Sequence, residues 1–300
     1  MENDKMKIAI LGAGAIGSLF GAYLSRKNDV IFIGRKEHVD KINSRGLIVE
    51  GIESFVVKGN GYIEYPGGAD IIFLTVKSYD TRNAMEGIKG ILNNELIVSL
   101  QNGIGNVEII SEYTENVIGA ITTEASTFVS PGVIRYTGKG ITKVGEIGKK
   151  NREKAVKVVS LINESGFKAE YTERIVDEIW IKAALNSCIN PLTAILEIRN
   201  GDLLEENLLP IIDCLIDENG RVLRELNIDI NLRDILFDVI RKTGENYSSM
   251  LQDIMHKKRT EIDQITGKII EYASRHNIEM PCSKTLYFMM KEKERIVQLK

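Results

Sequence analysis

A lysine and two asparagines recur at every fourth position in the second half of the chain: Lys182, Asn186 and Asn190. Residues four apart lie on the same side of an α-helix, so a helix here would present all three along one stripe. An ammonium and two amides are unusual on a stripe that faces a core, because buried polar groups cost free energy unless they are paired. The stripe therefore belongs to a solvent-facing surface or to a binding site, and spacing alone leaves both open. Pro191 cannot donate to the preceding turn, so we expect a kink or a helix end there that re-aims Asn200.

A glycine-rich turn lies near the amino terminus, between a short apolar run at 7–11 and a helical pattern from about 15 to 26. Its residues are Gly12, Ala13, Gly14, Ala15, Ile16 and Gly17. In a G-x-G-x-x-G turn the first glycine permits the tight turn, the second lets a pyrophosphate approach, and the third allows close helix–strand packing. The following helix offers unpaired N–H groups and the positive end of its dipole. Because the turn joins a strand to a helix, we interpret these residues as a dinucleotide-binding site rather than a structural turn.

The end of the second apolar run indicates which dinucleotide would bind. Sites for NAD usually carry an acidic residue there, which holds the ribose 2′-hydroxyl. Here Ile33 is followed by Gly34, Arg35 and Lys36, with no carboxylate. An arginine can hold a 2′-phosphate by charge-assisted, often bidentate hydrogen bonds. We therefore predict NADPH over NADH, with a solvated surface arginine as the alternative interpretation of Arg35.

Strand-like and helix-like segments alternate through the first half of the chain. Short apolar runs occur at 7–11, 30–33, 71–76, 96–100 and 117–121. Their alternation with helical patterns is typical of βαβ units and a parallel sheet. Beyond about Tyr171 nearly everything has the pattern of amphipathic helices. We therefore predict an α/β protein in which a Rossmann-type parallel-sheet domain, residues 1–171, precedes an all-helical domain, residues 172–300, with a ligand in the cleft between them.

Composition argues against several classes of partner. The formal net charge of −3 favours neither nucleic acid nor an anionic membrane surface. No uninterrupted apolar stretch approaches the roughly 18 to 20 residues that span a bilayer, and the first residues lack a signal-peptide pattern. Cys188, Cys214 and Cys282 are widely spaced without a C-x-x-C pair, so we expect reduced cytoplasmic thiols and neither a disulfide nor a zinc site. Acidic residues form no ligand cluster, and we expect no metal.

The segment around the lysine resembles one family. It runs Trp180-Ile181-Lys182-Ala183-Ala184-Leu185-Asn186-Ser187-Cys188-Ile189-Asn190-Pro191-Leu192-Thr193-Ala194 and continues to Arg199-Asn200-Gly201. The pattern W-x-K-x-x-x-N-x-x-x-N-P-L-T-A is similar to that of the ketopantoate reductases (2-dehydropantoate 2-reductases) and is not generic to dinucleotide-binding folds. Co-linear matches run the whole length and are poorest at about 131–148. They include the glycine turn, Thr75-Val76-Lys77, Gln101-Asn102-Gly103, Thr122-Thr123-Glu124-Ala125, Ser248-Ser249-Met250-Leu251-Gln252-Asp253 and Arg259-Thr260-Glu261-Ile262-Asp263.

The resemblance implies an enzyme that transfers hydride from NADPH to the ketone of 2-dehydropantoate, giving pantoate for pantothenate and coenzyme A biosynthesis. Because negative charge develops on the carbonyl oxygen, Lys182 would be the general acid. Asn102 would position Lys182 and contact both cofactor and substrate. The resemblance further implies substrate contacts by Asn186, Asn190, Asn200 and Ser249, and cofactor contacts by Lys77, Ala125 and Glu261.

A capping box, Ser249 with Gln252, predicts the start of a helix that continues through Glu261. A helix N-terminus with a serine hydroxyl suits a substrate carboxylate, although a purely structural cap would be favoured without the resemblance. An ideal helix from Ser249 to Glu261 would span about 18 Å, too far for one small keto acid to touch both. We therefore expect Ser249 to face the substrate and Glu261 to reach the nicotinamide ribose.

Two other functions stay open. A related reductase of another 2-keto or 3-hydroxy acid, of hydroxyisobutyrate or glycerol-3-phosphate dehydrogenase type, also pairs such a cofactor domain with a helical one and uses a lysine. The Asn-Pro-Leu-Thr-Ala string and the Ser249 segment argue against it. A non-catalytic NADPH sensor is disfavoured by the intact Lys182, Asn102 and Glu261. We expect a small keto acid as the partner and a cytoplasmic location, and a homodimer is compatible with the sequence.

Overall fold

The computed structural model describes residues 5–148 and 151–298. The chain divides into two compact units. One comprises Met1–Gln101 and Asn106–Glu178, and the other comprises Asn102–Gly105 and Ile179–Lys300. The chain passes from one unit to the other three times, and the third crossing falls inside helix α6 (Ile175–Leu196), whereas the sequence pattern changes character at about residue 171.

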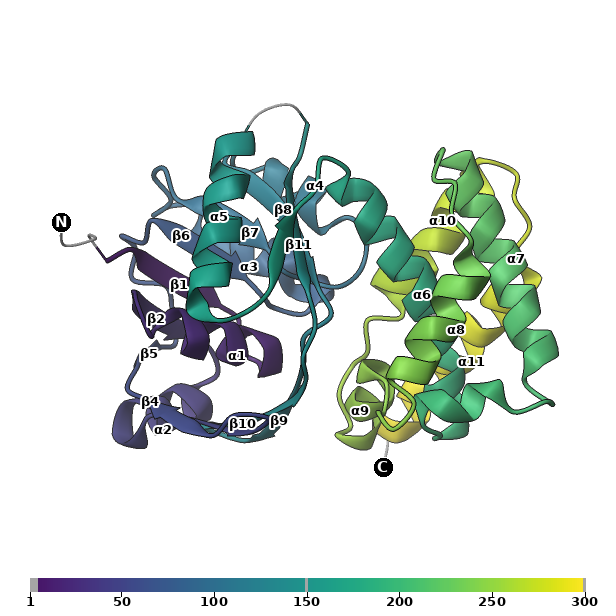
Figure 1. Ribbon diagram of the computed structural model, residues 1–300, viewed down its shortest axis with the longest axis horizontal. Coiled ribbons are helices and arrows are strands. Elements are labelled where there is room, and N and C mark those ends of the chain that lie inside the picture. The colour runs from purple at the N-terminus through teal and green to yellow at the C-terminus, as the bar shows by residue number, and fades with distance from the viewer. Residues whose placement is uncertain (1–4, 149–150, 299–300) are drawn as a thin grey trace. The chain divides into compact units, whose positions relative to one another are not determined.

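The first unit is an α/β domain, as predicted, built on an eight-stranded sheet (Figure 1). In order across the sheet the strands are β12 (Ala169–Tyr171), β11 (Thr142–Glu146), β8 (Val117–Thr122), β7 (Leu96–Ser99), β6 (Ile71–Leu74), β1 (Lys7–Leu11), β2 (Asp29–Ile33) and β5 (Asn60–Tyr62). From β5 to β8 every neighbouring pair is parallel, and β11 runs antiparallel to β8. The central strands are buried along almost their whole length, which explains why they occur in the sequence as continuous apolar runs.

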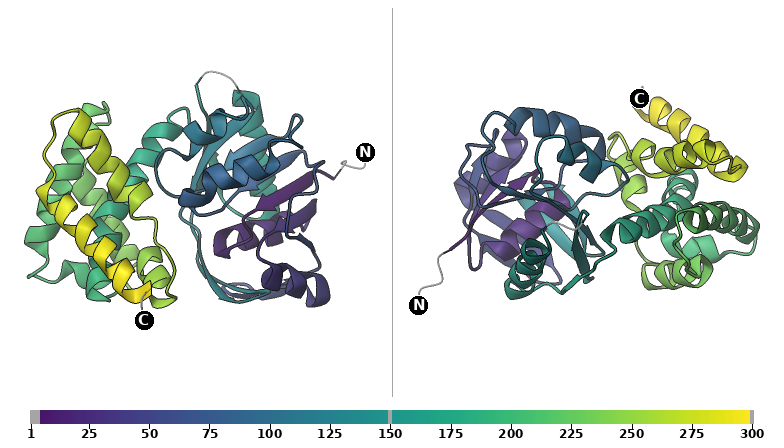
Figure 2. Two further views of the ribbon diagram at one scale, coloured as in Figure 1. Left: turned by 180° about the vertical axis from the view of Figure 1, so that it is seen from behind. Right: turned by 90° about the horizontal axis from the view of Figure 1, so that it is seen from above.

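Helices pack on both faces of this sheet (Figures 1 and 2). They are α1 (Ala15–Leu24), α2 (Lys36–Arg45), α3 (Thr81–Ile88), α4 (Asn106–Ser111) and α5 (Arg152–Ser165). Aromatic side chains fill the space beneath α1, where the ring of Phe167 stacks on those of Phe20 and Tyr23 at centroid distances of 4.6 and 4.2 Å. This packing fixes α1, and with it the turn that precedes the helix.

A second, four-stranded sheet was not expected from the sequence. Its order is β4 (Phe55–Val57), β3 (Leu47–Gly51), β10 (Val133–Gly138) and β9 (Ala125–Ser130). The buried His38 ties the β9–β10 turn to α1, because its Nδ1 accepts from the Gly132 N–H at 2.9 Å while its Nε2 lies 3.0 Å from the Ser18 hydroxyl. Burial lowers the pKa of His38 to about 4, so the ring is neutral and structural.

The second unit is helical over its described part. Its helices are α6 (Ile175–Leu196, shared with the first unit), α7 (Leu209–Glu225), α8 (Leu232–Lys242), α9 (Ser249–Met255), α10 (Lys268–Arg275) and α11 (Pro281–Gln298). Figure 1 shows the other helices gathered around the carboxyl-terminal half of α6. By length and composition α6 could cross a membrane, yet 61% of its most apolar window is buried inside the protein. The helix therefore has the character of a core helix, interrupted by Lys182, Asn186 and Asn190.

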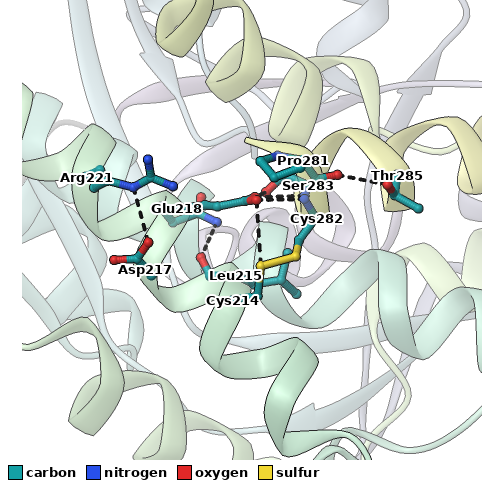
Figure 3. The surroundings of a disulfide bond; sticks show 10 residues. Cys214, Leu215, Asp217, Glu218, Arg221, Pro281, Cys282, Ser283 and Thr285 are labelled. Carbon is teal, nitrogen blue, oxygen red and sulfur yellow. Dashed lines mark hydrogen bonds and ion pairs between the residues drawn. A yellow bond between two sulfur atoms is a disulfide. The ribbon is translucent and has the colours of Figure 1, made fainter. Parts of the chain in front are cut away.

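Cys214 on α7 and Cys282 at the start of α11 form a disulfide (Figure 3). The expectation of reduced thiols is therefore wrong for this pair, while Cys188 remains a free, buried thiol. The two half-cystines are 68 residues apart in sequence but only 6.5 Å apart at their Cα atoms. Sequence spacing cannot reveal such a pair, because their proximity depends on the packing of α7 against α11.

The carboxylate of Glu218 lies against the same disulfide and caps α11 (Figure 3). It accepts hydrogen bonds from the Cys282 and Ser283 N–H groups at 2.6 and 2.8 Å, and from the Ser283 hydroxyl at 2.6 Å. One Glu218 oxygen and both sulfurs lie within 4.8 Å of one another, a spacing that could hold a metal ion. Sulfurs bonded to each other are not thiolate ligands, so this cluster acts as a cross-link between helices.

Thiol titration tests the cross-link directly. Denatured, unreduced protein should contain one reactive thiol, that of Cys188, and reduction should release two more. Reduction should also lower the free energy of unfolding by about 2–4 kcal/mol, because an open chain gains entropy in the unfolded state. Cys214→Ser should match the reduced wild type and should not respond to reductant. Three thiols before reduction would restore the expectation from sequence.

Candidate active site

The glycine turn joins β1 to α1 and packs directly on the end of β6. Gly12 has a φ of +106°, and a Cβ there would lie 2.4 Å from the backbone nitrogen of Val76. A Cβ on Gly17 would lie 2.4 Å from Thr75 Oγ1 and 2.6 Å from the Gly12 carbonyl oxygen. Contacts this short exclude a larger side chain, so the packing of the turn requires both glycines.

Gly14 differs from the other two glycines because it faces outward. It is exposed, and a Cβ there would meet only the Gly12 carbonyl oxygen, at 3.9 Å. The N–H groups of Gly12 and Ala13 already donate to a β2 carbonyl, at 3.0 and 2.8 Å. In the first turn of a helix the N–H groups have no intrahelical acceptor, so those of Ala15 and Ile16 can donate to a phosphate. The outer part of the turn therefore fits a dinucleotide pyrophosphate, while the inner residues Gly12, Ala13 and Gly17 hold the turn in its conformation.

Arg35 lies where α2 begins, directly after β2. Its side chain is exposed, and no hydrogen bond or ion pair of its guanidinium occurs among the described residues. The neighbouring Lys36 instead pairs with Asp40 at 2.8 Å. A Cβ on Gly34 would lie 3.2 Å from that of Ala13, so Arg35 lies next to the glycine turn. A guanidinium in this place is suited to a ribose phosphate.

Two further cofactor candidates also follow strand ends. Lys77 comes after β6 and is partly buried, and Ala125 is the first residue of β9, shortly after β8. Neighbouring strands β1 and β6 are joined at this edge, where the Thr75 N–H donates to the Leu11 carbonyl at 2.9 Å. The strand order reverses between β1 and β6, which is where open α/β sheets bind ligands. The glycine turn and Lys77 thus lie together at this position.

One helix carries the lysine and both asparagines of the predicted stripe. α6 continues through Pro191 and ends before Glu197, whose φ is +58°, so the helix does not end at the proline. The stripe does not face solvent: Lys182 and Asn186 are partly buried and Asn190 is 4% exposed. The surface alternative left open by the spacing is therefore disfavoured.

Lys182 lies in the field of a buried carboxylate. Burial lowers the pKa of the Lys182 ammonium from 10.5 to about 8, and the negative charge of Glu261 acts in the opposite direction. Glu261 is only 4% exposed, so its charge is poorly screened by solvent. At neutral pH the ammonium is mostly protonated, so it can donate a proton and stabilise developing negative charge.

The loop that carries Asn102 packs near the lysine and the glutamate. Ile104 is buried in an apolar cluster that includes Ala183, the residue after the lysine. The Ile104 N–H donates at 2.9 Å to the carbonyl of Gln264, in the π-helical turn η3 (Asp263–Gly267) that closely follows the glutamate. Three candidates from distant parts of the sequence are thus brought into one region.

Hydrogen bonds tie together the segments that carry Asn190, Asn200 and Ser249. The hydroxyls of Thr193 on α6 and Ser248 are 2.8 Å apart, which ties α6 to the start of α9. Asn200 is 8% exposed and donates from Nδ2 to Thr243 Oγ1 at 3.0 Å, in the segment that leads into Ser249. Its Oδ1 is buried with no hydrogen-bond partner among the described residues. Such an oxygen requires a donor, which a ligand hydroxyl or a water would supply.

Ser249 is not the residue that caps α9. The N-cap is Ser248, whose hydroxyl accepts from the Leu251 N–H at 3.1 Å. The predicted cap is wrong by one residue, because two adjacent serines satisfy the same preference. α9 ends at Met255, so Ser249 and Glu261 do not share a helix and the 18 Å estimate does not apply. Their assignment to substrate and ribose stays a prediction.

Sequence reasoning missed the residues that hold these side chains in place. Thr193 lies within the string that resembles the family, and Ser248 stands next to a predicted ligand residue, but neither pattern distinguishes a supporting hydroxyl from a binding one. Thr243 belongs to no motif. Their partners are remote in sequence, so only packing identifies them.

Comparison with known proteins gives two family matches. A family profile described as ketopantoate reductase PanE/ApbA matches residues 8–149, and its C-terminal counterpart matches residues 174–294. The 2-dehydropantoate 2-reductase of Pyrococcus horikoshii is 42% identical over 294 residues, which cover 96% of this chain and 98% of that protein. The protein of that name from Archaeoglobus fulgidus is 34% identical and covers 93% and 95%.

Solved structures of similar proteins share the fold of this chain. D-mandelate dehydrogenase, in a ternary structure with NADH and anilino(oxo)acetate, is 27% identical with a TM-score of 0.92, covering 98% of this chain and 100% of that one. A PanE/ApbA family ketopantoate reductase from Ralstonia eutropha JMP134 is also 27% identical, with a TM-score of 0.91 and the same coverage. The predicted fold class and family resemblance are confirmed.

Lys182 should titrate well below an ordinary lysine. We expect a midpoint near pH 8, because burial outweighs the attraction of Glu261. Glu261→Gln removes a charge that favours the ammonium, so the midpoint should move lower still. Competitive acylation of lysines across a pH series, read by mass spectrometry, measures both, with the exposed Lys284 as the reagent control. A midpoint above pH 10, or an upward shift in Glu261→Gln, would contradict this account.

Proposed function

Because the chain belongs to the ketopantoate reductase family, we propose that it reduces 2-dehydropantoate to pantoate with NADPH, a step in pantothenate and coenzyme A biosynthesis. The observation that carries the proposal is Lys182, partly buried in the field of Glu261, with a pKa lowered to about 8. Catalytic acids work best when their pKa lies near the working pH. A ketone reductase needs one such group, and here it stands on the helix that carries the family's pattern.

Reduction of a ketone requires a hydride at carbon and a proton at oxygen. A reduced nicotinamide supplies the hydride when it is bound. The Lys182 ammonium stabilises negative charge on the carbonyl oxygen and donates the proton to it. The amine that remains takes up a proton from solvent, which is favoured below pH 8. Glu261 raises the pKa of the lysine and so increases the charged fraction at neutral pH.

The amides and the hydroxyl would orient the keto acid. Asn186 and Asn190 continue the stripe of the lysine, and Asn190 lies one turn from the Thr193–Ser248 contact. Amide N–H groups and the Ser249 hydroxyl suit a carboxylate, because both can donate. The unpaired Oδ1 of Asn200 can only accept, so it suits the hydroxyl of 2-dehydropantoate.

The proposed cofactor is the phosphorylated dinucleotide. Two solved structures of the similar D-mandelate dehydrogenase hold NADH, which supports a nicotinamide dinucleotide on this fold. The choice of NADPH rests on Arg35, which is exposed beside the glycine turn at the place where NAD sites carry a carboxylate. The N–H groups of Ala15 and Ile16 would donate to the pyrophosphate, and Gly14, which has no side chain, would let it approach the backbone.

A second candidate is the reduction of a different 2-keto acid. The similarity to D-mandelate dehydrogenase favours it, since that protein shares the fold at an identity equal to that of the Ralstonia reductase. NADPH consumption with 2-dehydropantoate, measured against a panel of aryl and alkyl 2-keto acids, separates the two. A kcat/KM highest for another acid would move the assignment to it, and no turnover with any would favour an NADPH sensor.

The small substrate would be the only partner in our proposal, with no role for nucleic acid or a membrane, and the site of action would be the cytoplasm. The net charge of −3 supports the first part. A homodimer is compatible with this function. The Cys214–Cys282 disulfide does not support the cytoplasmic location, because such bonds are rare in the reducing cytoplasm of mesophiles.

Lys182→Ala should lower kcat for 2-dehydropantoate by about 10²–10⁴-fold, the usual contribution of a general acid. NADPH should still bind, because the glycine turn and Arg35 are untouched. Steady-state kinetics and fluorescence titration with NADPH provide the two readouts, and Lys284→Ala is the charge-matched control. Retained turnover in Lys182→Ala would remove the lysine from its role.

Arg35→Ala should raise the KM for NADPH by about 10–100-fold, the loss of a charge-assisted contact to one phosphate. The KM for NADH should change little, because NADH lacks that phosphate. Lys36→Ala is a matched control, because it also removes one positive charge, from the residue next to Arg35. The Lys36 side chain is paired with Asp40. Equal effects on the two cofactors would refute the assignment of Arg35.

A further inference from the structure

A cluster of buried polar side chains lies at the carboxyl end of β6 and β7. Its members stand in the turn after β6, at the start of α3, at the end of β7 and at the start of α4 (Figure 1). All are less than one-tenth exposed: Ser78 4%, Thr81 0%, Ser99 3%, Gln101 7% and Asn106 4%. Buried polar groups are costly unless paired, so their partners decide what the cluster does.

Gln101 links the two strand ends. Its Nε2 donates to the Val76 carbonyl oxygen at 3.0 Å and to Thr81 Oγ1 at 2.8 Å, and its Oε1 accepts from the Ser99 hydroxyl at 3.1 Å. A carbonyl oxygen can only accept, so the Val76 contact determines which way the amide is turned.

Thr81 is the centre of the cluster. Besides accepting from Gln101, its Oγ1 lies 2.9 Å from the Ser78 carbonyl oxygen and 2.8 Å from Asn106 Oδ1, and its one proton can serve either. The Nδ2 of Asn106 donates back to the Ser78 hydroxyl at 3.2 Å. These contacts form a closed ring of Ser78, Thr81 and Asn106. The ring joins the turn after β6 to the starts of α3 and α4, and so restricts the movement of these three segments relative to one another.

The cluster surrounds two predicted cofactor residues without including either. Val76 and Ser78, which it holds, are the chain neighbours of Lys77. Gln101 and Asn106 stand immediately before and after the loop 102–105. Its first residue, Asn102, is the second predicted cofactor residue. Both segments are thus held on both sides by one set of hydrogen bonds.

We propose that Thr81, Gln101 and Asn106 are positioning residues that set Lys77 and Asn102 for binding of the nicotinamide dinucleotide. The proposal rests on the cofactor part of the proposed function and not on the identity of the keto acid. Binding groups are effective when surrounding side chains hold them in the productive geometry. A cluster that served only the stability of the core would leave affinity for the dinucleotide unchanged in folded variants.

The test compares Thr81→Val, which removes the hydroxyl at nearly constant shape, with Thr81→Ser, which keeps it. The Kd for NADPH and for NADH is measured on the full chain by fluorescence titration without keto acid. Valine can neither accept from Gln101 nor donate to Asn106, so Thr81→Val loosens the segments that carry the two cofactor residues. For the dinucleotide that wild type binds, we expect this variant to raise the Kd about tenfold. Thr81→Ser should stay within about twofold of wild type.

A double-mutant cycle with Lys77→Ala separates positioning from stability. If Thr81 acts through Lys77 and Asn102, Thr81→Val should raise the Kd much less in the Lys77→Ala background than in wild type. Should Thr81→Val fail to fold, Gln101→Met takes its place in the cycle with the same expectation. An unchanged Kd in a folded variant, or fully additive effects in the cycle, overturns the proposal. Wild type that binds dinucleotide without reducing 2-dehydropantoate refutes only the substrate, whereas wild type that binds neither dinucleotide overturns this inference too.

Discussion

α6 has to satisfy two opposing requirements at once. Its apolar side chains contribute to the clusters of buried residues in the helical unit, through Ala183, Ala184, Cys188 and Ala194. The same helix carries an ammonium and two amides that cannot enter an apolar core unpaired. The helix can meet both demands only if its polar stripe faces other polar groups. Glu261 meets this requirement for Lys182, since its negative charge favours the ammonium.

Partial burial also sets the pKa of the lysine. Desolvation destabilises the ammonium of Lys182 relative to the amine, and the Glu261 carboxylate restores part of the lost stability. Hydroxyls also pair with one another or with an amide nearby, as in the Thr193–Ser248 contact and the hydrogen bond from Asn200 to Thr243. On the α/β side the corresponding constraint is steric, because Gly12 and Gly17 allow β6 to approach the turn closely.

Motif residues were the most predictable part of the protein. The glycine turn, the lysine stripe and the alternation of strands with helices all follow from short-range patterns, and the structure agrees with them. The errors arose where a local pattern had two solutions or none. Adjacent serines made the cap of α9 ambiguous, and the second sheet joins segments around β3 and β10 that are far apart in sequence. The Cys214–Cys282 bond likewise joins two helices across 68 residues.

The sequence by itself determined the fold class, the family and the candidate site residues, because periodicity and motif spacing act over a few residues of chain. Only the tertiary structure decided which hydroxyls support the site, which cysteines meet, and how far the pKa of Lys182 falls. Desolvation, hydrogen bonding and disulfide formation depend on distances between atoms that packing brings together. No local pattern contains those distances.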